Sequence, residues 1–229
     1  MKLAPFMRFV RHFPLGLILG LDSRITAYYR ICFLSALMSL PLFKSISAAP
    51  MTLEEIAGGI GGRNPDALQA WLDFGVSLGV LKKIGSTGYV LKDKLGKRLC
   101  DSRAEAWRAY YRLRIEVFQE HILRTPEYLA RGESIPLRDE YGELYADSSR
   151  TVEPVLIDVV GETTPKETPC RLLEVGCGSG VYLKKACESN PGLTAVGIEM
   201  QDSIARIARA AINKWNLGDR VSIINTDLR

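Results

Sequence analysis

Three glycines spaced two residues apart, Gly176, Gly178 and Gly180, follow an apolar run that contains a carboxylate, Glu174. Glycine allows the backbone to turn tightly and to approach a ligand without interference from a Cβ atom. A carboxylate in front of such a turn can accept hydrogen bonds from a cationic or amino-bearing group. The spacing therefore predicts a loop that binds a cofactor containing a nucleotide.

A strand before this loop and a helix after it must hold it in place. We expect strands at 171–175, 193–198 and 221–224, separated by helices at 181–189 and 203–217. Strands that alternate with helices form a parallel sheet, which binds ligands at the carboxyl ends of its strands. The prediction is a partial α/β Rossmann-like domain that contains its first three parallel strands.

Two more carboxylates lie at or near the ends of these strands. Glu199 follows the loop by about twenty residues and is placed to accept hydrogen bonds from both hydroxyls of a ribose. Asp227 follows the third strand, where it could bind the exocyclic amine of adenine. NAD is the alternative cofactor, but its loop needs Gly-x-Gly-x-x-Gly, and Val181 stands in the third glycine position. Glu174 would also face a pyrophosphate, which argues against NAD.

The first hundred residues are predicted to be rich in helix. The sequence favours a helix at 23–43, with Ser23 as its N-cap and Pro41 at its end. This segment is apolar on most faces, so a partner must cover it. The apolar run before it, 14–21, is also expected to form a buried helix, and neither run is expected to cross a membrane.

Short-range signals define the next elements. Thr52 and Glu55 form a capping box at the start of a short helix, and Asn64 is placed to cap a helix at 65–78. Two apolar segments then flank the glycines of 85–88, which predicts a β-hairpin. Three helices followed by a hairpin is the order of a winged helix.

Two uses of such a winged helix are open. Dimerisation is favoured, because the 65–78 helix offers Asp66, Gln69 and Asp73 rather than a row of basic residues that would bind phosphates. DNA binding is the alternative, and Lys82 and Lys83 on the hairpin are the clustered basic residues that it could use.

The middle of the chain is predicted to be a helical connector. A long charged helix is expected at 103–124, a second helix from Thr125, and an amphipathic helix at 139–160. Tyr141 and Tyr145 in the last of these either line the cofactor entrance or pack in the interior. The polar segment 161–169 contains two prolines and predicts a linker. The expected domains are therefore 1–100, 101–160, 161–169 and 170–229.

Composition limits the class of protein. The chain is 47% hydrophobic and 24% charged, as expected of a globular protein, and its net charge is +4. Thirteen basic and six acidic residues in 1–100 admit nucleic acid or an acidic partner, but such a surplus is also common on solvated surfaces, and nucleic acid is not favoured. Five cysteines without a Cys-x-x-Cys pair indicate a reduced, cytoplasmic protein. His121 has no ligand-type neighbour at a suitable spacing, so no metal is expected.

These motifs together resemble a known family. Residues 172–180 are similar to the first motif of class I S-adenosylmethionine-dependent methyltransferases, 196–200 to the second and 225–228 to the third. The helix-rich N-terminal segment, including 51–91, resembles the winged-helix dimerisation domain of small-molecule O-methyltransferases.

The resemblance implies S-adenosylmethionine as cofactor, a small-molecule methyl acceptor and a homodimer formed through the N-terminal helices. The residues that it implies around the cofactor are Glu174, Gly176, Cys177, Gly178, Ser179, Gly180, Glu199, Met200, Asp227 and Leu228. Glu174 and the glycines would line the methionine end, Glu199 would bind the ribose, and Met200 would pack on the adenine.

The sequence departs from the family pattern in its last part. The family sheet has seven strands, of which three are expected here, so the sequence is interpreted as a methyltransferase fragment. Neither His12 nor His121 matches the family's catalytic histidine, and no catalytic residue is assigned. The alternative is a non-catalytic dimerisation module or a winged-helix, DNA-binding regulatory module.

Overall fold

The computed structural model describes residues 15–136, 138–167 and 169–228, which form two compact units. The first unit extends to Ala104, and the second begins at Glu105. His12 lies outside the described residues. The helices predicted as a connector thus belong mostly to the same unit as the glycine loop, and the division precedes the predicted linker at 161–169.

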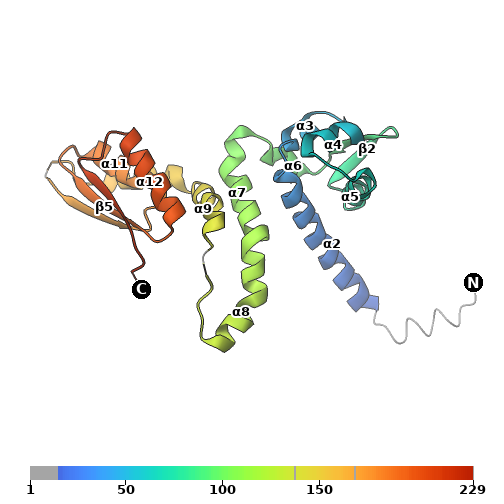
Figure 1. The fold of residues 1–229 in the computed structure, drawn as a ribbon, viewed down its shortest axis with the longest axis horizontal. Helices are drawn as coiled ribbons and strands as arrows, with labels where there is room; N and C mark the ends of the chain where they lie inside the picture. The colour runs from blue at the N-terminus through green and yellow to red at the C-terminus, as the bar shows by residue number, and fades with distance from the viewer. Residues whose placement is uncertain (1–14, 137, 168, 229) are drawn as a thin grey trace, which may run out of the picture. The chain divides into compact units, whose positions relative to one another are not determined.

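The first unit combines helices with a small antiparallel sheet (Figure 1). The sheet has the strand order β1-β3-β2. The elements are α2 (Leu15–Met38), α3 (Phe43–Ala48), β1 (Met51–Thr52), α4 (Leu53–Ile60), α5 (Pro65–Ser77), β2 (Leu81–Ile84), β3 (Gly88–Leu91), α6 (Lys94–Leu99) and the 3₁₀ turn η1 (Ser102–Ala104).

The predicted caps are confirmed. The backbone N–H of Glu55 donates to the Thr52 hydroxyl, and the N–H of Thr52 donates to the Glu55 carboxylate, at 3.2 and 2.7 Å. The side chain of Asn64 accepts from the N–H of Ala67 at the start of α5. The hairpin is also confirmed, and Gly85 has the positive φ of 63° that its turn requires.

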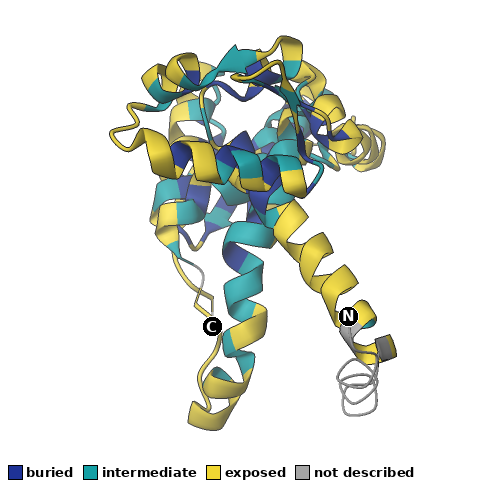
Figure 2. Cartoon of the chain, turned by 90° about the vertical axis from the view of Figure 1, so that its right-hand side faces the viewer, coloured by how far each residue is buried: buried dark blue, intermediate teal, exposed yellow. Residues whose placement is uncertain are grey.

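The predicted helix at 23–43 begins too late. α2 already includes Leu15, so Ser23 lies inside the helix and does not cap it, while the helix ends before Pro41 as expected. The apolar run before it is predicted as a buried helix; Pro14 lies outside the described residues, and from Leu15 on the run is helical but not buried at three of its leucines. Leu17, Leu19 and Leu21 are exposed, as the long exposed stretch of α2 shows (Figure 2).

The remainder of α2 packs into the core of the first unit. The Phe33 ring stacks on Trp71 of α5, with ring centroids 4.5 Å apart. Gly75, one turn after Trp71, leaves space for the same ring, because a Cβ atom there would lie 2.2 Å from Phe33 Cζ. Arg30 donates to the buried carboxylate of Asp93 at 2.7 Å, which joins α2 to the start of α6.

The second unit opens with a helical segment and continues into a parallel sheet. Its helical elements are α7 (Glu105–Leu113), the π-helical turn η2 (Arg114–Phe118), α8 (Gln119–Arg131), the 3₁₀ turn η3 (Asp139–Tyr141), α9 (Gly142–Ser149) and α10 (Glu153–Thr163).

The predicted start of a new helix at Thr125 is wrong, because α8 continues through Pro126. Proline removes one backbone donor from a helix and disfavours its interior. Here the Thr125 hydroxyl donates to the carbonyl of His121 at 2.7 Å. Arg124 pairs with Glu120 one turn earlier, so side-chain contacts support the helix at this point.

The predicted helix at 139–160 is divided in two. α9 ends at Ser149, and Pro154 lies in the first turn of α10, where its missing N–H costs no helical hydrogen bond. α10 then extends to Thr163, so the first residues of the predicted linker are helical. The hydroxyls of Thr163 and Thr164 donate to carbonyls of the last turn.

The predicted parallel sheet is confirmed, with strands β4 (Arg171–Val175), β5 (Thr194–Glu199) and β6 (Val221–Asn225) in the order β4-β5-β6. Two helices, α11 (Val181–Ser189) and α12 (Asp202–Lys214), contribute to one core against this sheet. The core is built from Cys177, Leu183, Ala186, Cys187, Leu193, Ala195, Ala208, Ile212 and Val221.

The opposite face of the sheet is apolar and open. Leu173 and Val175 alternate with Leu172 and Glu174 along β4 and are 61% and 63% exposed. Ile224 on β6 is 47% exposed. Among the described residues, this face of the three-stranded sheet is therefore apolar and uncovered.

Gly75→Ala is expected to destabilise the first unit by about 1–3 kcal/mol, because the new methyl group must displace the Phe33 ring. Gly58→Ala is the matched control, since it also places alanine in a helix but meets no atom within 4 Å. Urea unfolding followed by circular dichroism measures both. Equal stability of the two variants would contradict the packing described for Gly75.

Candidate functional site

The glycine loop joins β4 to α11 at the carboxyl end of the sheet. Gly176, Gly178 and Gly180 have φ values of 71°, 53° and 80°, in the left-handed region that residues with a Cβ atom rarely adopt. A Cβ atom on Gly176 or Gly178 would meet no atom within 4 Å, so open space adjoins the loop at both positions. The glycines are therefore required by the turn and also leave room beside it.

The loop is fastened to the end of the neighbouring strand. The N–H groups of Gly176 and Cys177 both donate to the carbonyl of Ile198, at 2.8 and 3.0 Å. The N–H of Gly178 donates to Oε2 of Glu199 at 3.1 Å, and the N–H of Gln201 donates to Oε1 at 3.0 Å. Glu199, only 8% exposed, thus connects the loop after β4 with the turn after β5.

The side chain of Cys177 points into the core. It is 3% exposed, and its Sγ would lie 2.8 Å from a Cβ atom on Gly197, so the thiol occupies space that glycine provides on β5. Burial, followed by the charges of Glu174 and Glu199, raises the pKa of this thiol to about 12. Only the backbone of Cys177 is therefore available to contact a ligand.

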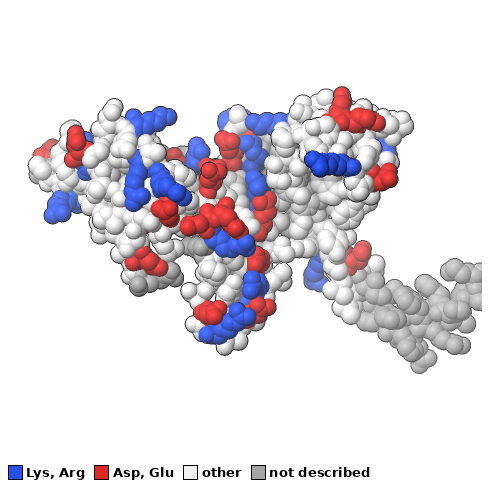
Figure 3. Space-filling view, in the orientation of Figure 1, with Lys and Arg blue, Asp and Glu red and all other residues white. Residues whose placement is uncertain are grey.

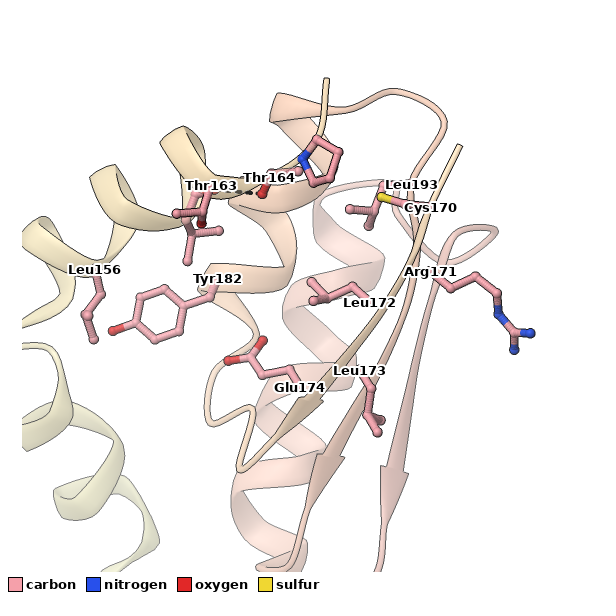
Figure 4. A pocket seen from close by; sticks show the side chains of 12 residues that line it. Leu156, Thr163, Thr164, Cys170, Arg171, Leu172, Leu173, Glu174, Tyr182 and Leu193 are labelled. Carbon is pink, nitrogen blue, oxygen red and sulfur yellow. Dashed lines mark hydrogen bonds between the residues drawn. The ribbon is translucent and has the colours of Figure 1, made fainter. Parts of the chain in front are cut away.

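Glu174 lies in a cavity of about 440 Å³ between β4, α10 and α11 (Figure 4). Its carboxylate points toward the side of the cavity that Tyr182 and Leu156 line. Oε2 is buried and has no hydrogen-bond partner among the described residues. Burial raises the pKa of Glu174 to about 7 from its usual 4.5. A cationic ligand group would satisfy this carboxylate.

The other predicted residues lie around two further cavities. Ser179 lines a cavity of about 510 Å³ beside the glycine loop, here called the loop cavity. Met200 and Asp227 line a separate cavity of about 400 Å³ beyond Glu199. Leu228 follows Asp227 and is 61% exposed. The structure therefore brings Glu199 to the loop and places most of the other predicted residues beside three cavities.

Some residues of these cavities were not predicted from the sequence. Tyr182 lines both the Glu174 cavity and the loop cavity, and its position directly after the glycine loop was a usable signal. Arg114 and Phe118 line the loop cavity from η2, more than fifty positions earlier, and no local motif marks them. Tyr145, one of two tyrosines considered for the entrance, does line this cavity.

The chain matches no protein-family model and no curated protein sequence. Its structure does match solved structures. The mitomycin 7-O-methyltransferase MmcR superposes with a TM-score of 0.64 at 16% identity, over 93% of this chain and 66% of that chain. The fold is the same.

Two more methyltransferase structures show this fold. An O-methyltransferase family protein from Burkholderia thailandensis gives a TM-score of 0.61 at 19% identity, over 93% of this chain and 64% of that chain. A third structure is that of the O-methyltransferase NcsB1 from neocarzinostatin biosynthesis, in complex with S-adenosylmethionine and 2-hydroxy-5-methyl naphthoic acid. It gives a TM-score of 0.61 at 16% identity, over 88% of this chain and 65% of that chain. The chain thus shares its fold with these structures over about two thirds of their length.

Glu174 predicts a pH dependence of stability. The folded carboxyl keeps its proton up to about pH 7, whereas the unfolded one loses it near 4.5, so the unfolded state binds fewer protons between these values. Stability should therefore fall as the pH rises from about 4.5 to 7. Glu174→Gln cannot ionise and should unfold at a higher temperature than the parent chain at about pH 8, with little difference at about pH 4.5.

Glu188→Gln is the control, because Glu188 lies on α11 with an exposed side chain. Melting temperatures of the three proteins, measured by circular dichroism across this pH range, provide the test. A Glu174→Gln variant that is less stable than the parent chain at about pH 8 would show that the buried carboxylate is satisfied in the folded chain.

Proposed function

We propose that this chain is the cofactor-binding part of an S-adenosylmethionine-dependent methyltransferase that methylates an oxygen atom of a small molecule. The observation that carries the proposal is the attachment of the glycine loop to Glu199 at the carboxyl ends of β4 and β5. Ligands of open α/β sheets bind at such strand ends. The shared fold and the S-adenosylmethionine complex of NcsB1 support the choice of cofactor.

Glu199 is proposed to bind the ribose. Each carboxylate oxygen accepts one backbone N–H, which fixes the side chain and leaves further lone pairs for the two hydroxyls of a ribose. A carboxylate cannot donate a hydrogen bond and would repel a 2′-phosphate. Met200 and Asp227, which line the cavity beyond Glu199, are proposed to contact the adenine, together with the neighbouring Leu228.

Glu174 is proposed to bind the amino group at the methionine end. Its buried oxygen has no partner among the described residues, and an ammonium group would pair with it and favour its ionised form. When bound, the cofactor would supply a methyl group on a positively charged sulfur for transfer to an acceptor oxygen. The chain's own contribution is to hold the cofactor in one orientation and to exclude water around it. We propose no catalytic base.

The first unit is proposed to be a winged-helix dimerisation domain. The order of α3, α4, α5 and the β2–β3 hairpin supports a winged helix. The exposed apolar side chains of α2, among them Leu17, Leu21 and Ile25, support a homodimer in which a second copy covers this helix. DNA binding is disfavoured, because Lys83 on the hairpin pairs with Asp73 of α5 at 3.4 Å.

Glu199→Ala should weaken binding of S-adenosylhomocysteine at least about tenfold, since the ribose loses its acceptor and the loop loses its attachment. Glu188→Ala, an exposed change on α11, should bind like the parent chain. Isothermal titration calorimetry measures all three proteins. Equal affinity of the Glu199→Ala variant and the parent chain, or no binding by the parent chain, would refute the cofactor assignment.

Light scattering coupled to size exclusion tests the dimer. The parent chain should have the mass of two copies. The double variant Leu21→Glu, Ile25→Glu places two charges on one face of α2 and should be monomeric. Leu129→Glu, at a 73% exposed position on α8, is the control and should remain dimeric. A monomeric parent chain would contradict the proposed role of α2.

A further inference from the structure

The loop cavity combines the glycine loop with an aromatic wall. Gly176, Cys177, Gly178 and Ser179 form one side of it. The opposite side comes from the helical segment at the start of the second unit. The aromatic residues that line the cavity are Tyr110, Phe118, Tyr145 and Tyr182. Its volume of about 510 Å³ lies in the range of small-molecule sites.

Arg114 in this wall has no carboxylate partner among the described residues. The other arginines of the described part of 105–163 all form ion pairs with Asp or Glu, namely Arg108, Arg112, Arg124, Arg131, Arg138 and Arg150. Basic and acidic side chains accordingly lie interspersed over α7 and α8 (Figure 3). An unpaired guanidinium is therefore an exception in this segment.

The guanidinium of Arg114 is nevertheless held in place. Its Cζ lies 4.7 Å from the ring centroid of Tyr110 and 4.7 Å from that of Phe118. Stacking on two aromatic rings restricts a flexible side chain and leaves the N–H groups at the edge of the guanidinium free to bind a ligand. Arg114 and Phe118 are the two ends of the π-helical turn η2, a distortion of helices that is frequent at functional sites.

A second hydrogen-bonding group lies beside the same aromatic ring. The Tyr145 ring lies 6.3 Å from the Phe118 ring, edge to face. Its hydroxyl is buried and has no hydrogen-bond partner among the described residues. Burial raises the pKa of Tyr145, so the hydroxyl keeps its proton and can donate it to an acceptor. Arg114 and Tyr145 both offer donors around one aromatic surface.

The acidic residue of the cavity does not compete for Arg114. Glu153 lines the cavity but pairs with Arg150 at 3.5 Å. The nearest acidic residue along the helix, Glu116, accepts from Arg112 at 2.8 Å. The cavity therefore presents a positive charge, a phenolic donor and aromatic faces next to the loop.

We propose that the loop cavity binds a methyl acceptor that is aromatic and carries a carboxylate, and that Arg114 and Tyr145 bind this carboxylate. The inference rests on the proposed function, because it places the acceptor next to the proposed cofactor loop. Arg114 is then the residue that determines specificity for an acidic over a neutral aromatic compound. A guanidinium binds a planar carboxylate through two parallel hydrogen bonds, which adds selectivity to the charge.

The probes are 3-hydroxy-2-naphthoate and 2-naphthol, which differ in the carboxylate. Both are fluorescent, and their binding to the full chain is measured by titration in the presence of S-adenosylhomocysteine. The parent chain should prefer the naphthoate at least about tenfold. Arg114→Gln should abolish this preference and leave naphthol binding unchanged, and Tyr145→Phe should reduce the preference in part.

Arg131→Gln is the matched control, because it removes the same charge from an exposed site on α8 and should keep the preference. Circular dichroism verifies that each variant is folded. If Arg114→Gln does not fold, Tyr145→Phe still tests the proposal, since it removes only one hydroxyl group. A parent chain without preference for the naphthoate, or a preference that persists in both variants, overturns the proposal.

S-adenosylhomocysteine also carries a carboxylate, at its methionine end. A second comparison therefore distinguishes binding of the acceptor's carboxylate by Arg114 from binding of the cofactor's. If Arg114 binds the cofactor instead, Arg114→Gln weakens the binding of S-adenosylhomocysteine but not that of methylthioadenosine, which lacks the amino-acid group. That result overturns the assignment to the acceptor and leaves the proposed function intact. A different result separates the two proposals. If S-adenosylhomocysteine does not bind but the preference for the naphthoate still depends on Arg114, the proposed function is refuted and the carboxylate site at Arg114 is supported.

Discussion

The contact between Glu199 and the N–H of Gly178 determines the geometry of the candidate site. The two residues belong to successive strand ends, and parallel pairing of β4 with β5 brings those ends together. The buried carboxylate accepts a second N–H, from Gln201, so it is fixed on both sides. These two hydrogen bonds offset the free-energy cost of burying the carboxylate, which would be large for a charge without partners. One side chain thus links the glycine loop with the turn after β5 at the proposed ribose site.

The glycines fit this arrangement for a local reason. All three have positive φ values, so the turn strongly favours glycine at these spacings. The same is true of the hairpin at Gly85. Signals of this kind, like the capping box at Thr52, act over a few residues and could be predicted from the sequence. The parallel sheet could also be predicted, because alternating strands and helices leave few topologies.

The predictions that were wrong, and the features that were missed, depend on contacts made elsewhere in the chain. Ser23 is a good cap in isolation, but a helix already precedes it. Pro126 usually marks the start of a helix, yet neighbouring side chains support a helix that passes through it. Arg114 stands out as unpaired only once the ion pairs of the six other arginines are known, and no sequence motif indicates those pairs. The π-helical turn that contains Arg114 has no recognised sequence signal either.

The raised pKa of Glu174 has a consequence for how the proposed site fills. Near neutral pH the carboxyl of Glu174 is in part protonated as long as no cation pairs with it. An ammonium group can pair with it only after that proton has left, so the site exchanges one positive charge for another. Occupation of the cavity and release of protons are then thermodynamically linked, and protons compete with the ligand as the pH falls.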